Sequence, residues 1–330
     1  MRRALTLAAM LTAAGCGSQN GLHLENGGHT VAVATTPVVS SGGGPPAKQP
    51  RRVTAQVSLG GVPTVAWDGS TVWAAVWPGG SQALGSLIGI DPATGRARPP
   101  LPLPPSTKPY LLAATGDGLF VATGRRLLRI DPADGRTIAA ATLGGAPRGM
   151  VETRGSLWVT VEGGVLLRLD SAQLRVQGST ALGGEPDAVT VVPGSVYVTD
   201  DRDRTLQRID PGSGRLQSTV SIAGESAGDP TVATVYGDSI WVFEGSSVVR
   251  LARRGELVLD RITLPAAGAS MAAGTGGVWV TGRFGVARID PGSGRLDTPV
   301  RLPGGAAALA TTGDAVWVAD NHGDVLRLSP

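Results

Sequence analysis

The sequence has a single cysteine, Cys16, among 330 residues. One cysteine cannot form an internal disulfide, so an exported protein of this kind must be stabilised by core burial and strand pairing. Charged residues are scarce at 17%, and the net charge is only +3. Nucleic-acid-binding proteins usually carry a basic stripe, and none is present here. We therefore expect no nucleic acid among the partners.

Long hydrophobic runs are also missing. The apolar stretch 5–14 is too short to cross a bilayer, which takes about 20 residues. It follows Arg2 and Arg3 and fits the apolar region of a secretory signal peptide. Removal of those two arginines would leave a net charge of about +1, which weakens further the case for an anionic polymer as a partner.

The one cysteine ends the segment Ala13-Ala14-Gly15-Cys16, which resembles a bacterial lipobox. The resemblance implies that residues 1–15 are a lipoprotein signal peptide and that Cys16 is acylated after cleavage. Several acyl chains on one residue anchor a protein firmly in a bilayer. We therefore expect a lipid-anchored protein on the extracytoplasmic face of the cell membrane. An ordinary signal peptide with an incidental cysteine is the alternative.

Residues 16–50 are rich in glycine, serine and proline and lack a hydrophobic period. They are predicted to be a flexible tether. The remaining chain, 51–330, contains one repeated pattern with a period of about 40 residues, and it is predicted to be a single domain. The aromatic residue that marks each copy occurs at Trp73, Phe120, Trp158, Tyr197, Trp241, Trp279 and Trp317.

Each copy has room for four short strands. The third and fourth strands are separated by an Asp-Pro-x-x-Gly-Arg type of turn, as at 210–215, in which proline presets φ and glycine takes the left-handed position. Four strands per repeat of this length indicate the blades of a β-propeller. The fold class is therefore all-β, a seven-bladed β-propeller of four-stranded blades.

The last copy ends after its third strand. The missing outer strand is predicted at the other end of the domain, where 53–59 alternate as a strand does. This N-terminal strand would complete the last blade and close the ring, which removes the exposed edges of an open array. We expect a monomer.

Segments such as Trp279-Val280-Thr281 and Arg288-Ile289-Asp290-Pro291 resemble the YVTN-type propeller repeat, a WD40-like group that also takes in the streptogramin B lyases. The resemblance covers residues 53–329. It implies the fold, whereas the activity stays open because one propeller shape carries many functions.

The loops on one rim of the ring are the expected place for a ligand site. Acidic residues gather there in the predicted blades 4 and 5, at Asp187, Asp200, Asp201 and Glu244, and Arg148 is placed next to them in blade 3. Carboxylates that converge can hold a divalent cation in the central funnel or a cationic ligand group. The alternative is a solvated acidic rim with Arg148 as a surface ion-pair partner.

Further candidate ligand contacts on this rim are Tyr110, Asp320 and His322. Tyr110 and other aromatics near the loops could stack on a flat ligand or pack between blades. The remaining aromatic candidates are Trp77, Phe243 and Phe284. His322 is the only histidine of the propeller and could serve as a general base only if it reached the funnel.

These features favour a non-catalytic module that binds a small ligand or a protein. A lyase of the streptogramin B type is the alternative. The resemblance implies a Pro-His-Gly base and a carboxylate-held Mg²⁺ for it, but the matching segment here is Pro147-Arg148-Gly149. Arginine stays protonated at neutral pH and cannot act as the base. A quinoprotein-like dehydrogenase is a third possibility, and the absence of the repeat tryptophan at Pro99, Ala139, Ser218 and Thr298 argues against it.

Overall fold

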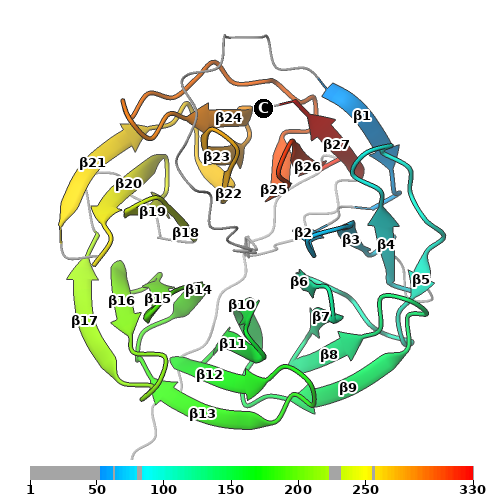
Figure 1. Ribbon diagram of the computed structural model, residues 1–330, viewed down its shortest axis with the longest axis horizontal. Coiled ribbons are helices and arrows are strands. Elements are labelled where there is room, and N and C mark those ends of the chain that lie inside the picture. The colour runs from blue at the N-terminus through cyan, green and yellow to red at the C-terminus, as the bar shows by residue number, and fades with distance from the viewer. Residues whose placement is uncertain (1–52, 62–63, 80–83, 223–231, 255–256, 330) are drawn as a thin grey trace, which may run out of the picture.

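The computed structural model describes residues 53–61, 64–79, 84–222, 232–254 and 257–329. The strands in these ranges form seven antiparallel sheets around a central axis (Figure 1). None of the described segments forms a helix that could span a membrane. The predicted signal peptide 1–15, Cys16 and the tether 16–50 lie outside the described residues. The domain is a seven-bladed β-propeller, which confirms the predicted fold.

Each blade runs outwards from the axis in chain order, except that blade 7 takes its outer strand from the start of the domain. Blade 1 consists of β2 (Thr64–Trp67), β3 (Val72–Val76), β4 (Ser86–Ile90) and β5 (Leu101–Pro102). Blade 2 consists of β6 (Leu111–Thr115), β7 (Gly118–Thr123), β8 (Arg126–Ile130) and β9 (Thr137–Thr142). Blade 3 consists of β10 (Pro147–Thr153), β11 (Ser156–Val161), β12 (Val165–Asp170) and β13 (Val176–Ala181). Blade 4 consists of β14 (Pro186–Val192), β15 (Ser195–Asp200), β16 (Thr205–Ile209) and β17 (Leu216–Ser221).

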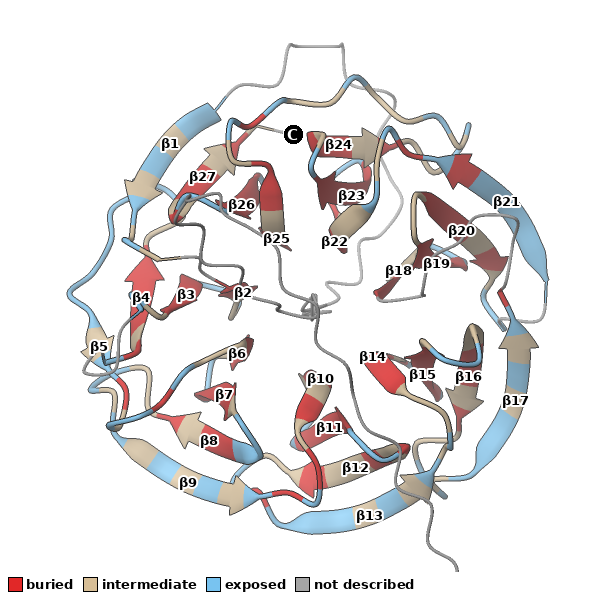
Figure 2. Cartoon of the chain, turned by 180° about the vertical axis from the view of Figure 1, so that it is seen from behind, coloured by how far each residue is buried: buried red, intermediate tan, exposed pale blue. Residues whose placement is uncertain are grey.

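The last three blades follow the same order. Blade 5 consists of β18 (Ala233–Tyr236), β19 (Ser239–Glu244), β20 (Ser247–Ala252) and β21 (Val258–Thr263). Blade 6 consists of β22 (Gly268–Gly274), β23 (Gly277–Gly282) and β24 (Gly285–Ile289). Blade 7 consists of β25 (Ala306–Thr311), β26 (Val316–Asp320), β27 (Asp324–Leu328) and the N-terminal strand β1 (Val53–Ser58). The inner and middle strands are buried, whereas the outer strands β9, β13, β17 and β21 are largely exposed (Figure 2).

Blade 6 has an irregular outer edge. The chain after β24 pairs with it only at two isolated bridges, Ile289 with Leu296 and Val286 with Val300. Pro299 lies just before the second bridge, and proline has no N–H to contribute to a strand ladder. The fourth position of this blade is therefore filled by an irregular segment.

The predicted ring closure is confirmed. Strand β1 pairs antiparallel with β27, from Val53 opposite Leu328 to Ser58 opposite Asp324. The Asp324 carboxylate accepts hydrogen bonds from Gln56 Nε2 at 2.7 Å and from Ser58 Oγ at 2.5 Å. The first strand of the domain thus completes the last blade, and no outer strand is missing from it.

The core lies between blades and is built around the repeat aromatics, each of which is at most 3% exposed. In six blades an arginine of the third strand stands directly opposite the aromatic, as Arg168 does opposite Trp158. Four of these arginines donate to a backbone carbonyl of the next blade's outer turn: Arg129 to Ala172, Arg168 to Pro211, Arg250 to Pro291 and Arg327 to Pro92. The repeat therefore supplies both the apolar core and a polar brace between blades.

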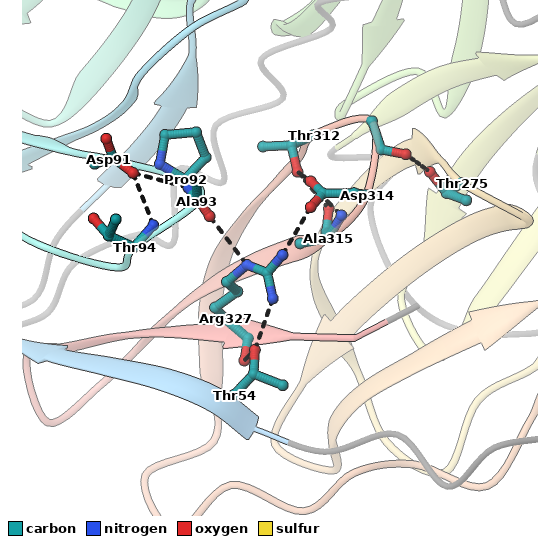
Figure 3. Close-up of polar contacts among 11 residues, drawn as sticks. Thr54, Asp91, Pro92, Ala93, Thr94, Thr275, Thr312, Asp314, Ala315 and Arg327 are labelled. Carbon is teal, nitrogen blue, oxygen red and sulfur yellow. Dashed lines mark hydrogen bonds and ion pairs between the residues drawn. The ribbon is translucent and has the colours of Figure 1, made fainter.

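Arg327 provides this brace where the two ends of the domain meet (Figure 3). Its Nε donates to the Pro92 carbonyl of blade 1 at 3.2 Å, and its Nη1 donates to Thr54 Oγ1 of β1 at 3.0 Å. Its Nη2 lies 2.8 Å from an Asp314 carboxylate oxygen. One side chain thus links the first blade, the last blade and the closing strand.

The aspartates of the outer turns, among them Asp131 and Asp210, have a structural role. Asp210 Oδ1 accepts the Ser213 N–H at 2.7 Å and the Gly212 N–H at 3.1 Å. Asp131 Oδ1 accepts the Ala133 N–H at 2.9 Å. These carboxylates hold the turns between third and fourth strands.

Candidate functional site

The candidate site lies on the rim formed by two sets of loops. Within a blade the first residue of the inner strand pairs with the end of the second strand, as Pro147 does with Val161. The loop before the inner strand and the loop after the second strand therefore share one rim. The inner strands contact one another around the whole ring, including β25 against β2.

Arg148, the second residue of β10, contacts two carboxylates of blade 4. Its Nε lies 3.3 Å from Asp187 Oδ1, and its Nη2 donates to Asp201 Oδ2 at 3.0 Å. The Asp187 side chain is only 3% exposed, and that of Arg148 is 16% exposed. The predicted proximity of Arg148 and Asp187 is therefore present, but as a mostly buried ion-pair group and not as a solvated surface pair. We call these three residues the Arg148 cluster.

The local sequence explains why this cluster can form. Gly149 follows Arg148, and a Cβ at that position would lie 2.5 Å from the Asp187 carbonyl oxygen. The absence of a side chain lets β10 and β14 approach closely enough for Arg148 to reach across. Thr160 Oγ1 also donates to the Asp187 carbonyl and fixes the same junction from β11.

Asp200 is fully buried at the end of β15. Its Oδ1 accepts the Asp203 N–H at 2.9 Å, so the carboxylate caps the loop between the second and third strands. Its Oδ2 lies against Gly184, which has φ of +56° and no room for a Cβ. The Asp200 side chain therefore stabilises the rim loop from within the blade and is not exposed at the rim.

Glu244 ends β19 and is also fully buried. It forms ion pairs with Arg204, from the loop of blade 4, and with Arg261 of β21. Arg261 Nη2 in turn donates to the Ile222 carbonyl at 2.9 Å. Glu244 therefore joins blades 4 and 5, which differs from the predicted convergence of four carboxylates. Among the described residues no group of three or more acidic, histidine or cysteine side chains could hold a metal ion.

Asp320 and His322 belong to one loop of blade 7. Asp320 is 3% exposed, and its Oδ1 accepts the N–H groups of His322 and Asp324, each at 2.9 Å. The carboxylate thus caps the loop. The His322 side chain is exposed, and its ring lies against Gly304 of the neighbouring loop, where a Cβ would come within 2.9 Å of Cδ2.

Tyr110 joins blades 2 and 3. Its hydroxyl oxygen lies 2.8 Å from the Gly124 carbonyl oxygen and 3.0 Å from the Pro147 carbonyl oxygen. Burial raises the pKa of the Tyr110 phenol, and the negative charge of Glu162 raises it further. The phenol therefore stays neutral and serves as a hydrogen-bond donor between the two blades.

Of the other aromatic candidates, one packs in the core and two lie at the rim. Phe243 is buried and fills the space above Gly268, so it has the packing role. Lys108 Nζ lies 5.1 Å from the centre of the Trp77 ring, and Phe284 lines a hollow at the rim. Ligand binding by Tyr110, Arg148, Asp187, Asp200, Glu244, Asp320 and His322 stays a prediction.

Arg204 and Arg261, the partners of Glu244, were not predicted from the sequence. The alternation Asp200-Asp201-Arg202-Asp203-Arg204 was a usable signal, because opposite charges this close together are often engaged with neighbouring loops. No local feature of the sequence indicates that Arg261, on an outer strand, would contact Glu244 at the rim.

No known family profile matches the chain. No curated protein sequence matches it either. Several solved structures share its fold. A catalytically inactive variant of virginiamycin B lyase from Staphylococcus aureus with quinupristin has a TM-score of 0.72 at 19% identity, over 85% of this chain and 99% of that one.

A streptogramin B lyase structure has a TM-score of 0.68 at 16% identity, over 83% of this chain and 94% of that one. The Pan2 WD40 domain from Neurospora crassa has a TM-score of 0.70 at 11% identity, over 84% of this chain and 95% of that one. Lyases and a WD40 domain thus resemble the chain to a similar degree. At these identities the likeness establishes the β-propeller fold and no particular activity.

Proposed function

We propose that the chain is a non-catalytic binding protein that is held at the extracytoplasmic face of a membrane by Cys16. Its propeller would present an irregular rim to a small ligand or a protein. The rim loops differ in sequence from blade to blade, whereas the outer turns repeat. Variable loops on a rigid scaffold are a common arrangement for recognition.

The position of Arg148 and its two carboxylate contacts are the main support for this proposal. It occupies the place at which the lyase resemblance implies a histidine base, and two carboxylates hold it there. A guanidinium in contact with two carboxylates keeps its proton at any physiological pH. His322 lies in a different loop, where its ring rests on Gly304 and makes no side-chain hydrogen bond with another described residue. A general base has to be held in a fixed orientation towards its substrate. The contact with Gly304 alone does not hold the His322 ring in this way.

The lyase alternative is tested with quinupristin, the compound present with the Staphylococcus aureus lyase variant. The purified chain is incubated with quinupristin and Mg²⁺, and chromatography with fragmentation mass spectrometry separates the ring from its linear product. The Staphylococcus aureus lyase and its inactive variant serve as controls. We expect the ring to stay intact. A linear product that is lost in His322→Ala would overturn the non-catalytic proposal.

The membrane anchor is tested separately. Labelling of producing cells with an alkyne fatty acid should mark the wild-type protein and leave Cys16→Ser unmarked. The variant should also leave the membrane fraction, because acyl chains supply the binding free energy. Equal labelling of both proteins would refute acylation at Cys16 and leave the proposed role of the rim to be judged on its own.

A further inference from the structure

A hollow of about 380 Å³ opens on the rim between blades 6 and 7. Its lining comes from two loops, 283–284 after β23 and 301–303 ahead of β25. The lining residues are Arg283, Phe284, Arg301, Leu302 and Pro303. The volume lies within the range of small-molecule sites, about 300–1,000 Å³.

The two loops are held together by backbone contacts. Val286 and Val300 exchange hydrogen bonds, with the Val286 N–H donating at 3.0 Å and the Val300 N–H donating at 2.8 Å. Gly285, with φ of +99°, lies so close that a Cβ would overlap the Val300 carbonyl and come within 3.0 Å of the Arg301 Cα. The backbone positions of Arg283 and Arg301 are therefore fixed on one side of the same junction.

Phe284 and Leu302 contribute an apolar part of the lining. Leu302 is 8% exposed and belongs to the apolar core between blades 6 and 7. Phe284 packs against the core between blades 5 and 6, and its ring fills the space beside Gly282, where a Cβ would approach within 2.7 Å. Both apolar residues are thus anchored in the body of the ring.

Two cationic side chains accompany this apolar surface. Arg283 and Arg301 are exposed, and neither has a hydrogen bond or ion pair with another described residue. Arg148, Arg204 and Arg288 on the same propeller each contact a carboxylate. The positive charge of this hollow is therefore not neutralised within the described chain.

We infer that this hollow binds a small organic anion, a carboxylate or a phosphate attached to an apolar or aromatic body. Guanidinium groups form paired hydrogen bonds with such anionic oxygens. Phe284 and Leu302 would contact the apolar body, and the two arginines would hold the charged end. The inference deepens the proposed binding function and rests on it, but the site is in blades 6 and 7, apart from the Arg148 cluster in blades 3 and 4 (Figure 1).

Phenyl phosphate is the probe, titrated into the purified chain by calorimetry. Arg283→Gln and Arg301→Gln should each weaken its binding about tenfold, which equals the loss of roughly one charge-assisted hydrogen bond. Arg215→Gln is the matched control, because Arg215 is exposed in an outer turn of blade 4. Its affinity should equal that of the wild type, and all three variants should melt as the wild type does.

Two other probes test the chemistry of the ligand. Inorganic phosphate should bind more weakly than phenyl phosphate, and phenethylamine should not bind. Vesicles with phosphatidylglycerol distinguish a lipid headgroup from a free anion, since only a headgroup site would bind vesicles in competition with phenyl phosphate. Equal affinity of the wild type and both arginine variants, or equal binding of phenethylamine, would overturn the inference.

The two proposals can fail separately. Cleavage of quinupristin would contradict the non-catalytic function while leaving arginine-dependent binding of phenyl phosphate in place. Arginine-independent binding of the probe would remove this anion site while leaving the absence of turnover as it was.

Discussion

Replacement of Arg327 by methionine should weaken the joint that closes the ring. Methionine keeps most of the apolar stem of the side chain and removes the guanidinium, so packing beside Trp317 is largely retained. The variant loses the contacts of Arg327 with Pro92, Thr54 and Asp314 (Figure 3). Each contact connects β27 to a different part of the closing joint.

The size of the effect follows from how far each partner is exposed. The Arg327 side chain is 20% exposed, so its part-buried bond to the Pro92 carbonyl is worth about 1 to 2 kcal/mol. Thr54 is exposed, so the bond to its hydroxyl is worth less, about 0.5 to 1 kcal/mol. The Asp314 side chain is 69% exposed, and such a pair contributes about 0.5 kcal/mol or less. The free energy of unfolding should fall by about 1.5 to 3.5 kcal/mol, which corresponds to a melting temperature lower by about 3 to 6 °C in a domain of this size.

Thermal and denaturant melting followed by circular dichroism measure this loss. Arg215→Met controls for the removal of an arginine, because the exposed Arg215 side chain makes no hydrogen bond or ion pair with another described residue. The double variant with Thr54→Val isolates the bond between β27 and β1, with an expected coupling of about 1 kcal/mol. A melting temperature of Arg327→Met within a degree of the wild type would refute the view that this side chain braces the closure.

Three further outcomes are expected. Tyr110→Phe should lower the free energy of unfolding by about 1 kcal/mol, because the carbonyls of Gly124 and Pro147 lose their donor. Tyr236→Phe should leave it unchanged, because the Tyr236 hydroxyl makes no hydrogen bond with another described residue; equal melting of the two variants would contradict the bridging role of Tyr110. Gly285→Ala should lower the free energy of unfolding by about 1 to 3 kcal/mol, because its φ is +99° and a Cβ would overlap the Val300 carbonyl. Gly178→Ala, where the Cβ meets open space, should lower it little. Chemical denaturation of both variants measures the two free energies. Hydrogen bonds from the residue three positions later lower the pKa of four turn aspartates, Asp91, Asp170, Asp210 and Asp290. Their folded pKa lies below the unfolded value of about 3.9, so their contribution is present above that pH and is lost as the pH falls through the folded pKa. Acid unfolding of Asp210→Asn should therefore be less steep than that of the wild type, and an unchanged slope would count against this source of stability.

The repeat made most of the fold predictable. Trp73 and Trp317 mark the first and last copies because the interface between blades needs a large aromatic at one place in each second strand. The position of 53–59 was predictable because the last copy lacked an outer strand, and β1 now fills it. The irregular edge of blade 6 was not foreseen, since it depends on Pro299, which interrupts an otherwise compatible segment.

The rim was less predictable. Strand alternation placed Arg148 beside Asp187, because both occupy the start of neighbouring inner strands. The same reasoning put Glu244 with the acidic group, but Arg204 and Arg261 reach it from other parts of the ring. Local patterns tell which end of a strand a residue occupies. They do not tell which long side chain from another blade will neutralise it.

The closing joint has a mechanical consequence. Val53 is paired with Leu328 at one end of the antiparallel ladder between β1 and β27. A pull on the chain at Val53 that is directed away from β27, across the strands, acts on the terminal pair first and separates the pairs one after another. Less force is needed for this than for shearing all the pairs at once. If a membrane holds the chain ahead of Val53, the pairing of β1 with β27 that closes the ring also bears the force. Such a force would open blade 7 before any other blade.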